Sequence, residues 1–180
     1  GLAVMPTGQS LLIRLPFLAD EDSAAAYSRL LHGGLVAAQV PLRSDPTVAR
    51  TLLFDSTGSR YVLDESAVPP RLPTDVAASR SGYVLWIKHV VPSTGSAVIS
   101  EPHLWRAGVD TVVPPFQFAR IASPTVAENG AIAFAGVELE EGRRLDPDPE
   151  LDIFASAAGT VRRVTLNGNE DDAPVYDGVT

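Results

Sequence analysis

The sequence of 180 residues contains no cysteine, which excludes disulfide bonds, thiolate catalysis and cysteine-ligated zinc sites. It has a single lysine, Lys88, and its arginines are scattered, so the chain carries no basic stripe. Because the formal net charge is −8, a nucleic-acid phosphate backbone and an anionic lipid surface are both poor partners. No apolar run approaches the roughly 18–20 residues that span a bilayer, so we expect no membrane insertion.

Catalytic motifs are also missing. The chain has no G-x-S-x-G nucleophile elbow, no G-x-G-x-x-G or P-loop phosphate motif and no H-E-x-x-H zinc motif. A histidine that acts as a general base needs a serine and an orienting carboxylate within hydrogen-bond reach. The sequence does not single out such partners for His32, His89 or His103. We therefore expect structural or surface histidines and no catalysis by this chain alone.

Turn-forming residues are plentiful. The 14 glycines and 15 prolines are spread along the chain rather than gathered in one linker. An apolar fraction of 45% argues against disorder, and a chain of this length can bury a core. This composition is typical of many short strands joined by turns.

The turns recur at a fixed period. Gly34, Gly82, Gly130 and Gly178 are each 48 residues apart. A second series stands at intervals of 50, 50 and 51 residues: Gly8, Gly58, Gly108 and Gly159. Two landmarks with nearly the same period indicate an internal structural repeat.

The order of segments is constant within each repeat. A strand-like run follows the first glycine, at residues 35–40, 83–91 and 131–137. After a polar loop comes a short strand with an aromatic residue near its end, namely Phe54, Trp105 and Phe154. The second glycine then forms a hairpin turn into a last strand, because glycine adopts the positive φ that such turns need. With a short opening strand before the first glycine, each repeat has four strands.

The run after each first glycine is apolar on both faces. In AIAFAGV, the side chains of Ile132 and Phe134 point one way and the intervening alanines point the other way. A strand that stays apolar throughout is covered on both sides. We therefore expect Ile132 and Phe134 to be buried, together with Val84 and Trp86.

These features predict an all-β fold: a β-propeller-like array of four-stranded antiparallel blades within one domain, residues 1–180. Three full repeats are expected at about 16–65, 66–115 and 116–170, with partial ones at 1–15 and 171–180. An immunoglobulin-like sandwich is the alternative, although it does not impose a period of 48 residues. The only helix candidate, residues 20–34, is interpreted as an opening strand with a longer approach.

Residues 120–178 resemble the TolB-type (WD-like) propeller repeat, in which a serine-proline-aromatic opening leads to a strand of the form DG-x-x-IAF, an Asp-Ile-Tyr strand, a glycine turn, an Arg-x-Leu-Thr strand and the proline of the next blade. The matching positions are Ser123-Pro124, Asn129-Gly130, Ile132-Ala133-Phe134, Asp152-Ile153-Phe154, Gly159, Arg163-Val164-Thr165 and Ala173-Pro174. The resemblance implies a propeller, commonly extracytoplasmic (periplasmic or secreted), that recognises another protein or accompanies a catalytic domain.

Candidate binding residues are few. Asp146, Asp148 and Asp152 alternate in LDPDPELD and offer the oxygen ligands that calcium prefers, although a solvated loop is favoured over a calcium site. No other cofactor is expected.

Apolar residues offer candidate contacts with a protein. Phe116 and Phe118 lie in VPPFQF, which is either an exposed interaction edge or a segment packed under the neighbouring repeat. Leu11 and Leu12 belong to SLLIRL, a segment whose strand edge could pair with another chain.

The combined expectation is a non-catalytic module for protein interaction or scaffolding, whose partner is another protein or a second copy bound through open strand edges. Two alternatives stay open. The chain could be the propeller portion of a hydrolase or oxidoreductase whose active site needs residues from elsewhere, or it could be a structural assembly subunit.

Overall fold

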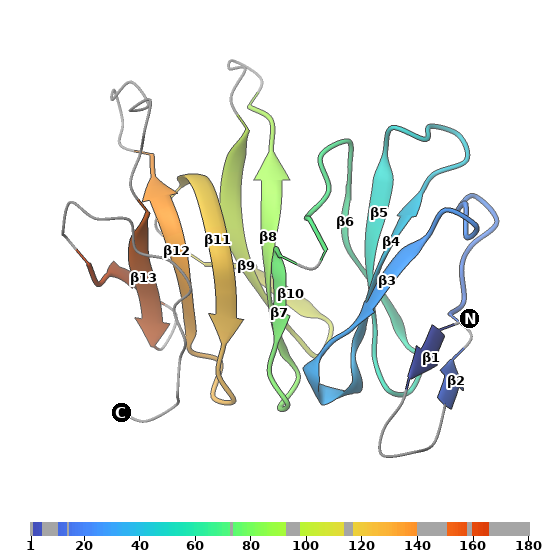
Figure 1. Ribbon diagram of the computed structural model, residues 1–180, viewed down its shortest axis with the longest axis horizontal. Helices are drawn as coiled ribbons and strands as arrows, with labels where there is room; N and C mark the ends of the chain where they lie inside the picture. The colour runs from blue at the N-terminus through green and yellow to red at the C-terminus, as the bar shows by residue number, and fades with distance from the viewer. Residues whose placement is uncertain are drawn as a thin grey trace.

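The computed structural model describes residues 2–4, 11–13, 15–72, 74–92, 98–113, 117–139, 151–157 and 160–165. Within these ranges the chain is all-β, with antiparallel strand pairs and one 3-10 turn, η1 (His32–Gly34). None of these residues forms a helix that is long and apolar enough to cross a membrane. After an N-terminal hairpin, the strands form three groups that stand side by side along the long axis of the molecule (Figure 1).

Each group is a four-stranded meander in which every strand pairs with the next one along the chain. Unit 1 comprises β3 (Tyr27–Leu30), β4 (Val36–Pro41), β5 (Ala49–Phe54) and β6 (Arg60–Ser66). Unit 2 comprises β7 (Val76–Ala78), β8 (Tyr83–Val90), β9 (Ile99–Arg106) and β10 (Val109–Val112). Unit 3 comprises β11 (Phe118–Val126), β12 (Ile132–Glu138), β13 (Asp152–Ala157) and β14 (Thr160–Arg163). The hairpin that precedes them is β1 (Leu2–Val4) and β2 (Leu11–Ile13). The all-β, antiparallel class predicted from the sequence is confirmed.

The glycines of the first repeat series occupy equivalent turns. Gly34, Gly82 and Gly130 have φ of +74°, +85° and +84°, which favours glycine over residues with a Cβ atom. Each turn leads into the second strand of its unit, β4, β8 or β12. In the second series, Gly58 and Gly108 also have positive φ. Gly178 of the first series and Gly8 and Gly159 of the second series lie outside the described residues. The candidate helix at residues 20–34 instead contains β3, as the repeat predicts.

Strand register corrects one detail of the predicted repeat, namely the equivalence of Trp105 and Phe154. Val84 in β8 pairs with Trp105, and Ile132, at the equivalent place in β12, pairs with Ser156. Ser156 is therefore the counterpart of Trp105, and Phe154 lies two residues earlier in its strand. One further pair, Phe118 with Ser100, joins β11 to β9. Units 2 and 3 thereby form one eight-stranded sheet, while unit 1 is a separate sheet.

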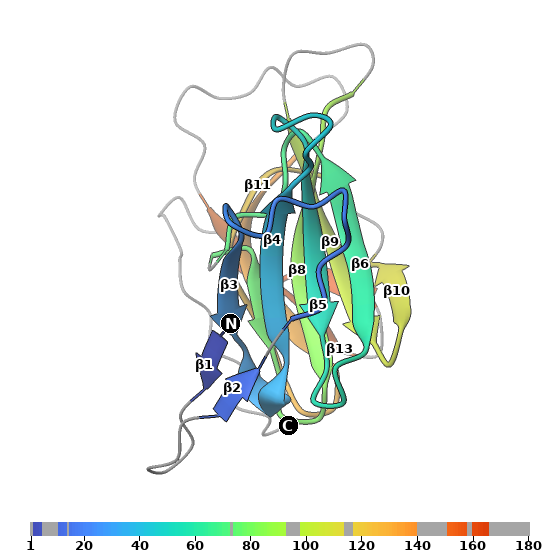
Figure 2. The same ribbon diagram turned by 90° about the vertical axis from the view of Figure 1, so that its right-hand side faces the viewer.

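The units pack through the two faces of their second strands. On one face of β8, Val84 and Trp86 lie in an apolar cluster with side chains of unit 1. On the other face, Leu85 and Ile87 lie in a cluster with side chains of unit 3, including Phe134. Burial of the apolar runs on both faces is therefore confirmed. Figure 2, turned to look along the row, shows the sheet of unit 1 in front of unit 2.

The cluster between units 2 and 3 centres on three phenylalanine rings. Phe134 is stacked with Phe154 at a centroid distance of 5.7 Å, and Phe118 meets both rings edge-on at 5.1 and 4.9 Å. All three side chains are fully buried. Aromatic pairs of this geometry contribute beyond their buried area.

Replacing Phe134 by Ala should lower the free energy of unfolding by about 3–5 kcal/mol, because it leaves a cavity and removes two ring contacts. Chemical denaturation of both proteins measures the difference. Val62→Ala, at an exposed site on β6, should change stability by no more than about 0.5 kcal/mol. Equal effects of the two substitutions would show that Phe134 is not in a tight core.

Candidate functional site

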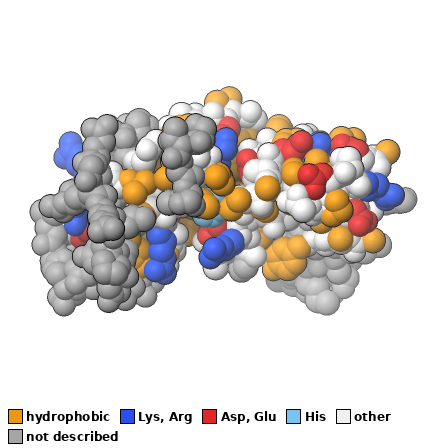
Figure 3. All heavy atoms as spheres, turned by 90° about the horizontal axis from the view of Figure 1, so that it is seen from above, with side chains coloured by type: hydrophobic (Ala, Val, Ile, Leu, Met, Phe, Trp, Pro, Cys, Tyr) orange, Lys and Arg blue, Asp and Glu red, His pale blue; other side chains and the backbone are white. Residues whose placement is uncertain are grey.

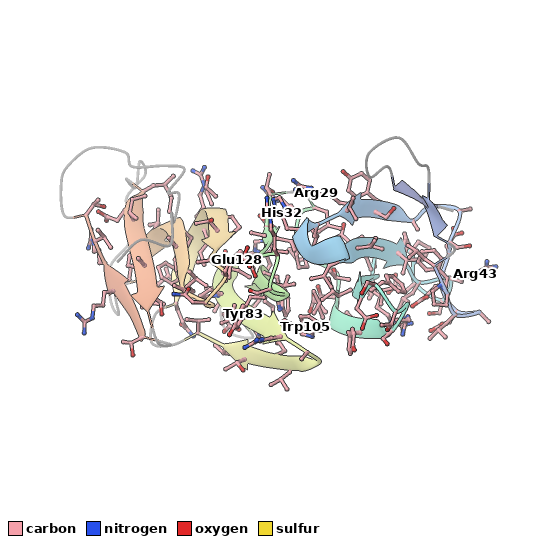
Figure 4. The ribbon with its side chains drawn as sticks, turned by 90° about the horizontal axis from the view of Figure 1, so that it is seen from below. Arg29, His32, Arg43, Tyr83, Trp105 and Glu128 are labelled. Carbon is pink, nitrogen blue, oxygen red and sulfur yellow. The ribbon has the colours of Figure 1, made fainter. Side chains whose placement is uncertain are left out.

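A large groove runs along the first strands of all three units. We call it the first-strand groove: it has a volume of about 840 Å³ and is lined by residues 29–32, 74, 76–80, 123–126 and 128. These residues come from β3 and η1, from β7 and the turn that follows it, and from β11 and its turn. In Figure 4, Arg29, His32 and Glu128 lie near the middle of the molecule, where the units meet. One groove therefore collects side chains from three successive repeats.

Equivalent turn residues line this groove. His32, Arg80 and Glu128 each lie two residues before a turn glycine and are therefore 48 residues apart. The turns touch: a Cβ atom added to Gly33 would lie 3.1 Å from the carbonyl oxygens of both Ser79 and Arg80. The backbone of the turns thus repeats, while the side chains they present differ from unit to unit.

Glu128 ties the turn of unit 3 to the turn of unit 2. Its carboxylate accepts hydrogen bonds from the backbone nitrogen of Arg80 at 3.0 Å and from that of Ser81 at 2.6 Å. The Ser81 hydroxyl donates to the Glu128 carbonyl oxygen at 2.6 Å. The bond from Arg80, aided by those from Ser81, holds the pKa of Glu128 below its ordinary value. Glu128 is thus an ionised residue that joins two turns.

One wall of the groove contains a strained bulge. Ser123 has a φ of +50°, which is unusual for a residue other than glycine. The β11–β12 register shifts between Ala122 and Thr125, on either side of Ser123 and Pro124. Proline has no N–H to donate to the sheet, so it is found at such irregular positions. Both Ser123 and Pro124 line the groove, and backbone strain of this kind clusters at functional sites.

A serine, a histidine and an aspartate form a chain of contacts beside the groove. His89 Nε2 lies 2.8 Å from Asp75 Oδ2, and Ser100 Oγ lies 3.4 Å from His89 Nδ1. Asp75 also accepts hydrogen bonds from the backbone nitrogen of Arg71 at 2.6 Å and from the Thr74 hydroxyl at 3.1 Å. Ser100 is only 2% exposed, so a substrate cannot reach its hydroxyl. The chain of contacts anchors β7 to β8 and β9.

Burial alone would raise the pKa of Asp75. The hydrogen bond to His89 and the backbone donor from Arg71 outweigh burial, so the pKa of Asp75 lies below its ordinary value. Asp75 is therefore ionised at neutral pH and accepts hydrogen bonds from two neighbouring segments.

His103 is held in a comparable way. Asp110 Oδ2 lies 2.7 Å from His103 Nδ1, and Asp110 Oδ1 accepts a hydrogen bond of 2.8 Å from Trp86 Nε1. The ring of Trp86 lies 4.5 Å from that of His103. These contacts fix β10 against β9 and β8. His32, in contrast, is exposed on the wall of the first-strand groove.

A buried carboxylate, that of Glu21, is the centre of a cluster of charged side chains on unit 1. Glu21 forms ion pairs with Arg50 at 2.8 Å and with Arg60, and it accepts a hydrogen bond from the Leu18 backbone nitrogen at 2.7 Å. Arg50 also pairs with Glu65 at 2.7 Å. Acidic and basic side chains accordingly lie next to one another over unit 1 in Figure 3. The acidic and basic side chains of this cluster pair with one another. They hold the segment that contains Glu21 against β5 and β6.

The structure describes only some of the residues singled out from the sequence as contact candidates. Phe118 is fully buried against Phe134 and Phe154, so it belongs to the core rather than to an interaction edge. Phe116 lies outside the described residues. Leu11 and Leu12 belong to β2, where they pair with residues of β1.

The aspartates considered as calcium ligands are not brought together by the described part of the chain. Asp146 and Asp148 lie outside it. Asp152 is buried, forms an ion pair with Arg163 and accepts a hydrogen bond of 3.2 Å from the Thr165 hydroxyl. Among the described residues, no three His, Asp or Glu side chains form a group that could hold a metal ion.

Comparison of the chain with protein-family models, with curated proteins and with solved structures found no match. The first-strand groove is not among the sites predicted from the sequence. The signal that could have found it is the repeat itself, because His32, Arg80 and Glu128 share one position relative to the turn glycines.

Replacing Asp75 by Asn should lower the free energy of unfolding at pH 7 by about 1–3 kcal/mol, because it weakens buried hydrogen bonds. The folded-state pKa of Asp75 is depressed, so its stabilisation is present above the unfolded-state pKa of about 3.9 and is lost as the pH falls through the folded-state value. The gap between wild type and variant should therefore shrink as the pH falls below about 4.

Denaturation series between pH 3 and 7 measure this gap. Asp22→Asn, which alters a carboxylate that accepts a hydrogen bond from the nearby Ala24 backbone nitrogen, is the control for the loss of one carboxylate. A gap that does not shrink below about pH 4 would contradict the account of Asp75.

Proposed function

We propose that units 1–3 are blades of a β-propeller and that the chain is a non-catalytic module that binds a partner protein in the first-strand groove. The observation that carries this proposal is the groove itself, built from the same strand of three successive repeats. In a propeller, four-stranded blades surround a central channel, so a surface shared by equivalent strands of neighbouring blades corresponds to the channel wall.

Three features support the propeller interpretation. The units have the same strand order, they pack face to face through their second strands, and β7 contacts both η1 of unit 1 and β11 of unit 3. The TolB-type resemblance of residues 120–178 points in the same direction and adds the proposal of an extracytoplasmic location.

Binding is favoured over catalysis by the state of the polar groups beside the groove. Glu128 is already occupied by the turn of unit 2, and Ser100, which has a histidine and an aspartate in line behind it, is buried. A general base or a nucleophile has to reach the reacting atom of a substrate. In this geometry both side chains serve to hold the fold.

The lining of the groove indicates the chemistry of the partner. Arg29, His32 and Arg80 place basic side chains there, although the chain as a whole carries a formal charge of −8. Leu30, which is 43% exposed, adds an apolar contact surface. We therefore propose a partner segment that presents a carboxylate to Arg80 and an apolar side chain to Leu30, since complementary charge fixes register and speeds association.

Selection of displayed peptides on the immobilised protein tests the proposal. The selected peptides should combine Asp or Glu with an adjacent apolar residue. Arg80→Glu should weaken their binding at least about tenfold, because it replaces an attractive charge pair with a repulsive one. The backbone hydrogen bond from residue 80 to Glu128 does not depend on the side chain and should persist.

Arg162→Glu is the matched control, because it reverses an exposed arginine on β14, outside the groove. It should leave binding unchanged, and both variants should keep the circular dichroism spectrum of the folded wild type. A peptide affinity that is equal in wild type and Arg80→Glu would contradict the proposed site. A selection that enriches no common peptide sequence would contradict it too.

A further inference from the structure

A second groove lies between units 2 and 3, at their outer strands. We call it the outer groove: its volume is about 370 Å³, and its lining includes the aliphatic side chains of β9, β10 and β12. Tyr83, Arg106, Thr111 and Ser156 also line it. None of them lines the first-strand groove. In Figure 4, Tyr83 and Trp105 lie beside the β10 ribbon, away from Arg29 and His32.

The equivalent place between units 1 and 2 is filled. Tyr61 of β6 packs edge-on against Trp105 of β9, with ring centroids 5.1 Å apart. A Cβ atom added to Gly108 would lie 3.3 Å from the Tyr61 ring. Two aromatic side chains therefore close the outer part of the first interface.

Strand register identifies the residues that replace this aromatic pair in the second interface. Tyr61 pairs with Leu53, and Thr111 pairs with the equivalent Leu104, so Thr111 stands where Tyr61 does. Ser156 is the counterpart of Trp105, because their partners in β12 and β8 are equivalent. Two small residues thus replace two large rings, and both line the outer groove. The groove is the space that the missing aromatic side chains would occupy.

One charged side chain lies on the wall of this space. The guanidinium of Arg106 stacks over the ring of Tyr83, 4.2 Å from its centroid, and donates a hydrogen bond to the Tyr83 hydroxyl. The Tyr83 ring is in turn held against the turn of unit 3, since a Cβ atom on Gly130 would lie 2.7 Å from it. Arg106 is thereby oriented at an otherwise uncharged groove, where a guanidinium is suited to bind a carboxylate.

Strand β10 offers a surface next to the groove. All four of its residues are exposed, and β9 is its only strand partner among the described residues. Val109 and Val112 are 65% and 52% exposed. An extended segment that lies along such a strand gains apolar contacts in addition to those made inside the groove.

We propose that the outer groove binds the C-terminal residue of a partner polypeptide when that residue is aromatic. The aromatic side chain fills the space between Thr111 and Ser156, and the terminal carboxylate pairs with Arg106. The residues before it lie along β10. This site is independent of the first-strand groove, so either can be present without the other.

The test uses the tripeptide acetyl-Val-Ser-Trp with a free carboxylate, followed by NMR titration of the methyl groups of the protein. The expected result is saturable shifts at Val109, Val112 and Ile132. The same tripeptide with a terminal amide should bind at least about tenfold more weakly, because it cannot pair with Arg106. Absence of saturable shifts with the free acid would overturn the proposal.

Two variants test separately how the aromatic ring and the carboxylate of the ligand contribute to binding. Thr111→Tyr restores the aromatic residue found in unit 1 and should abolish binding. Arg106→Gln removes the charge at an exposed position and should make the acid and the amide bind equally. If Thr111→Tyr does not fold, the comparison of acid and amide binding by Arg106→Gln still tests the proposal. Unchanged preference for the acid in Arg106→Gln would overturn the assignment of Arg106.

Two further comparisons define the ligand and the site. Acetyl-tryptophan alone should bind more weakly than the tripeptide, because it makes no contact along β10. Equal affinity would overturn the polypeptide assignment and indicate a site for small aromatic acids. Arg80→Glu should leave tripeptide binding unchanged, so failure here is distinguishable from failure of the first-strand groove.

Discussion

The second strand of each unit is apolar on both faces, and the need to cover both faces at once underlies the rest of the structure. Within β8, Val84 and Trp86 pack towards unit 1 while Leu85 and Ile87 pack towards unit 3. A single sheet cannot bury two apolar faces by itself. The units must therefore stand face to face, and this stacking brings the turns and first strands of neighbouring units into contact.

Stacking also creates the surfaces that are available for binding. Where the turns meet, the glycines constrain the backbone. His32 and Arg80 line the groove rather than the packed faces, so the chemistry of their side chains can differ from unit to unit. At the outer strands, large side chains close one interface and small ones leave the other open. A repeat that keeps its backbone can thus vary its recognition surfaces independently.

The sequence predicted the parts of the fold that depend on backbone geometry and hydrophobic pattern. Positive φ at Gly82 and burial of Phe134 follow from turn chemistry and from an apolar run. It did not predict the register that makes Ser156 the counterpart of Trp105, since an aromatic two residues earlier matched the pattern equally well. Register is set by the whole ladder of pairs, which a local pattern does not contain.

The polar contacts could not be predicted from the sequence for a different reason. Asp75, His89 and Ser100 lie on three separate segments, and only the folded chain brings them within hydrogen-bond distance. Glu128 likewise meets the backbone of Arg80 across an interface between two units. Aspartate, glutamate and serine occur throughout the sequence, so composition and spacing do not select the members of these networks.

Successive units stack face to face in the observed register, and contacts between side-chain protons measure this directly. Nuclear Overhauser spectra of the protein should show contacts between Tyr61 and Trp105 and between Phe134 and the methyl groups of Leu85 or Ile87, because these side chains share the two interfaces. Spectra in which Tyr61 contacts no residue of unit 2, or Phe134 contacts no residue outside unit 3, would contradict the account.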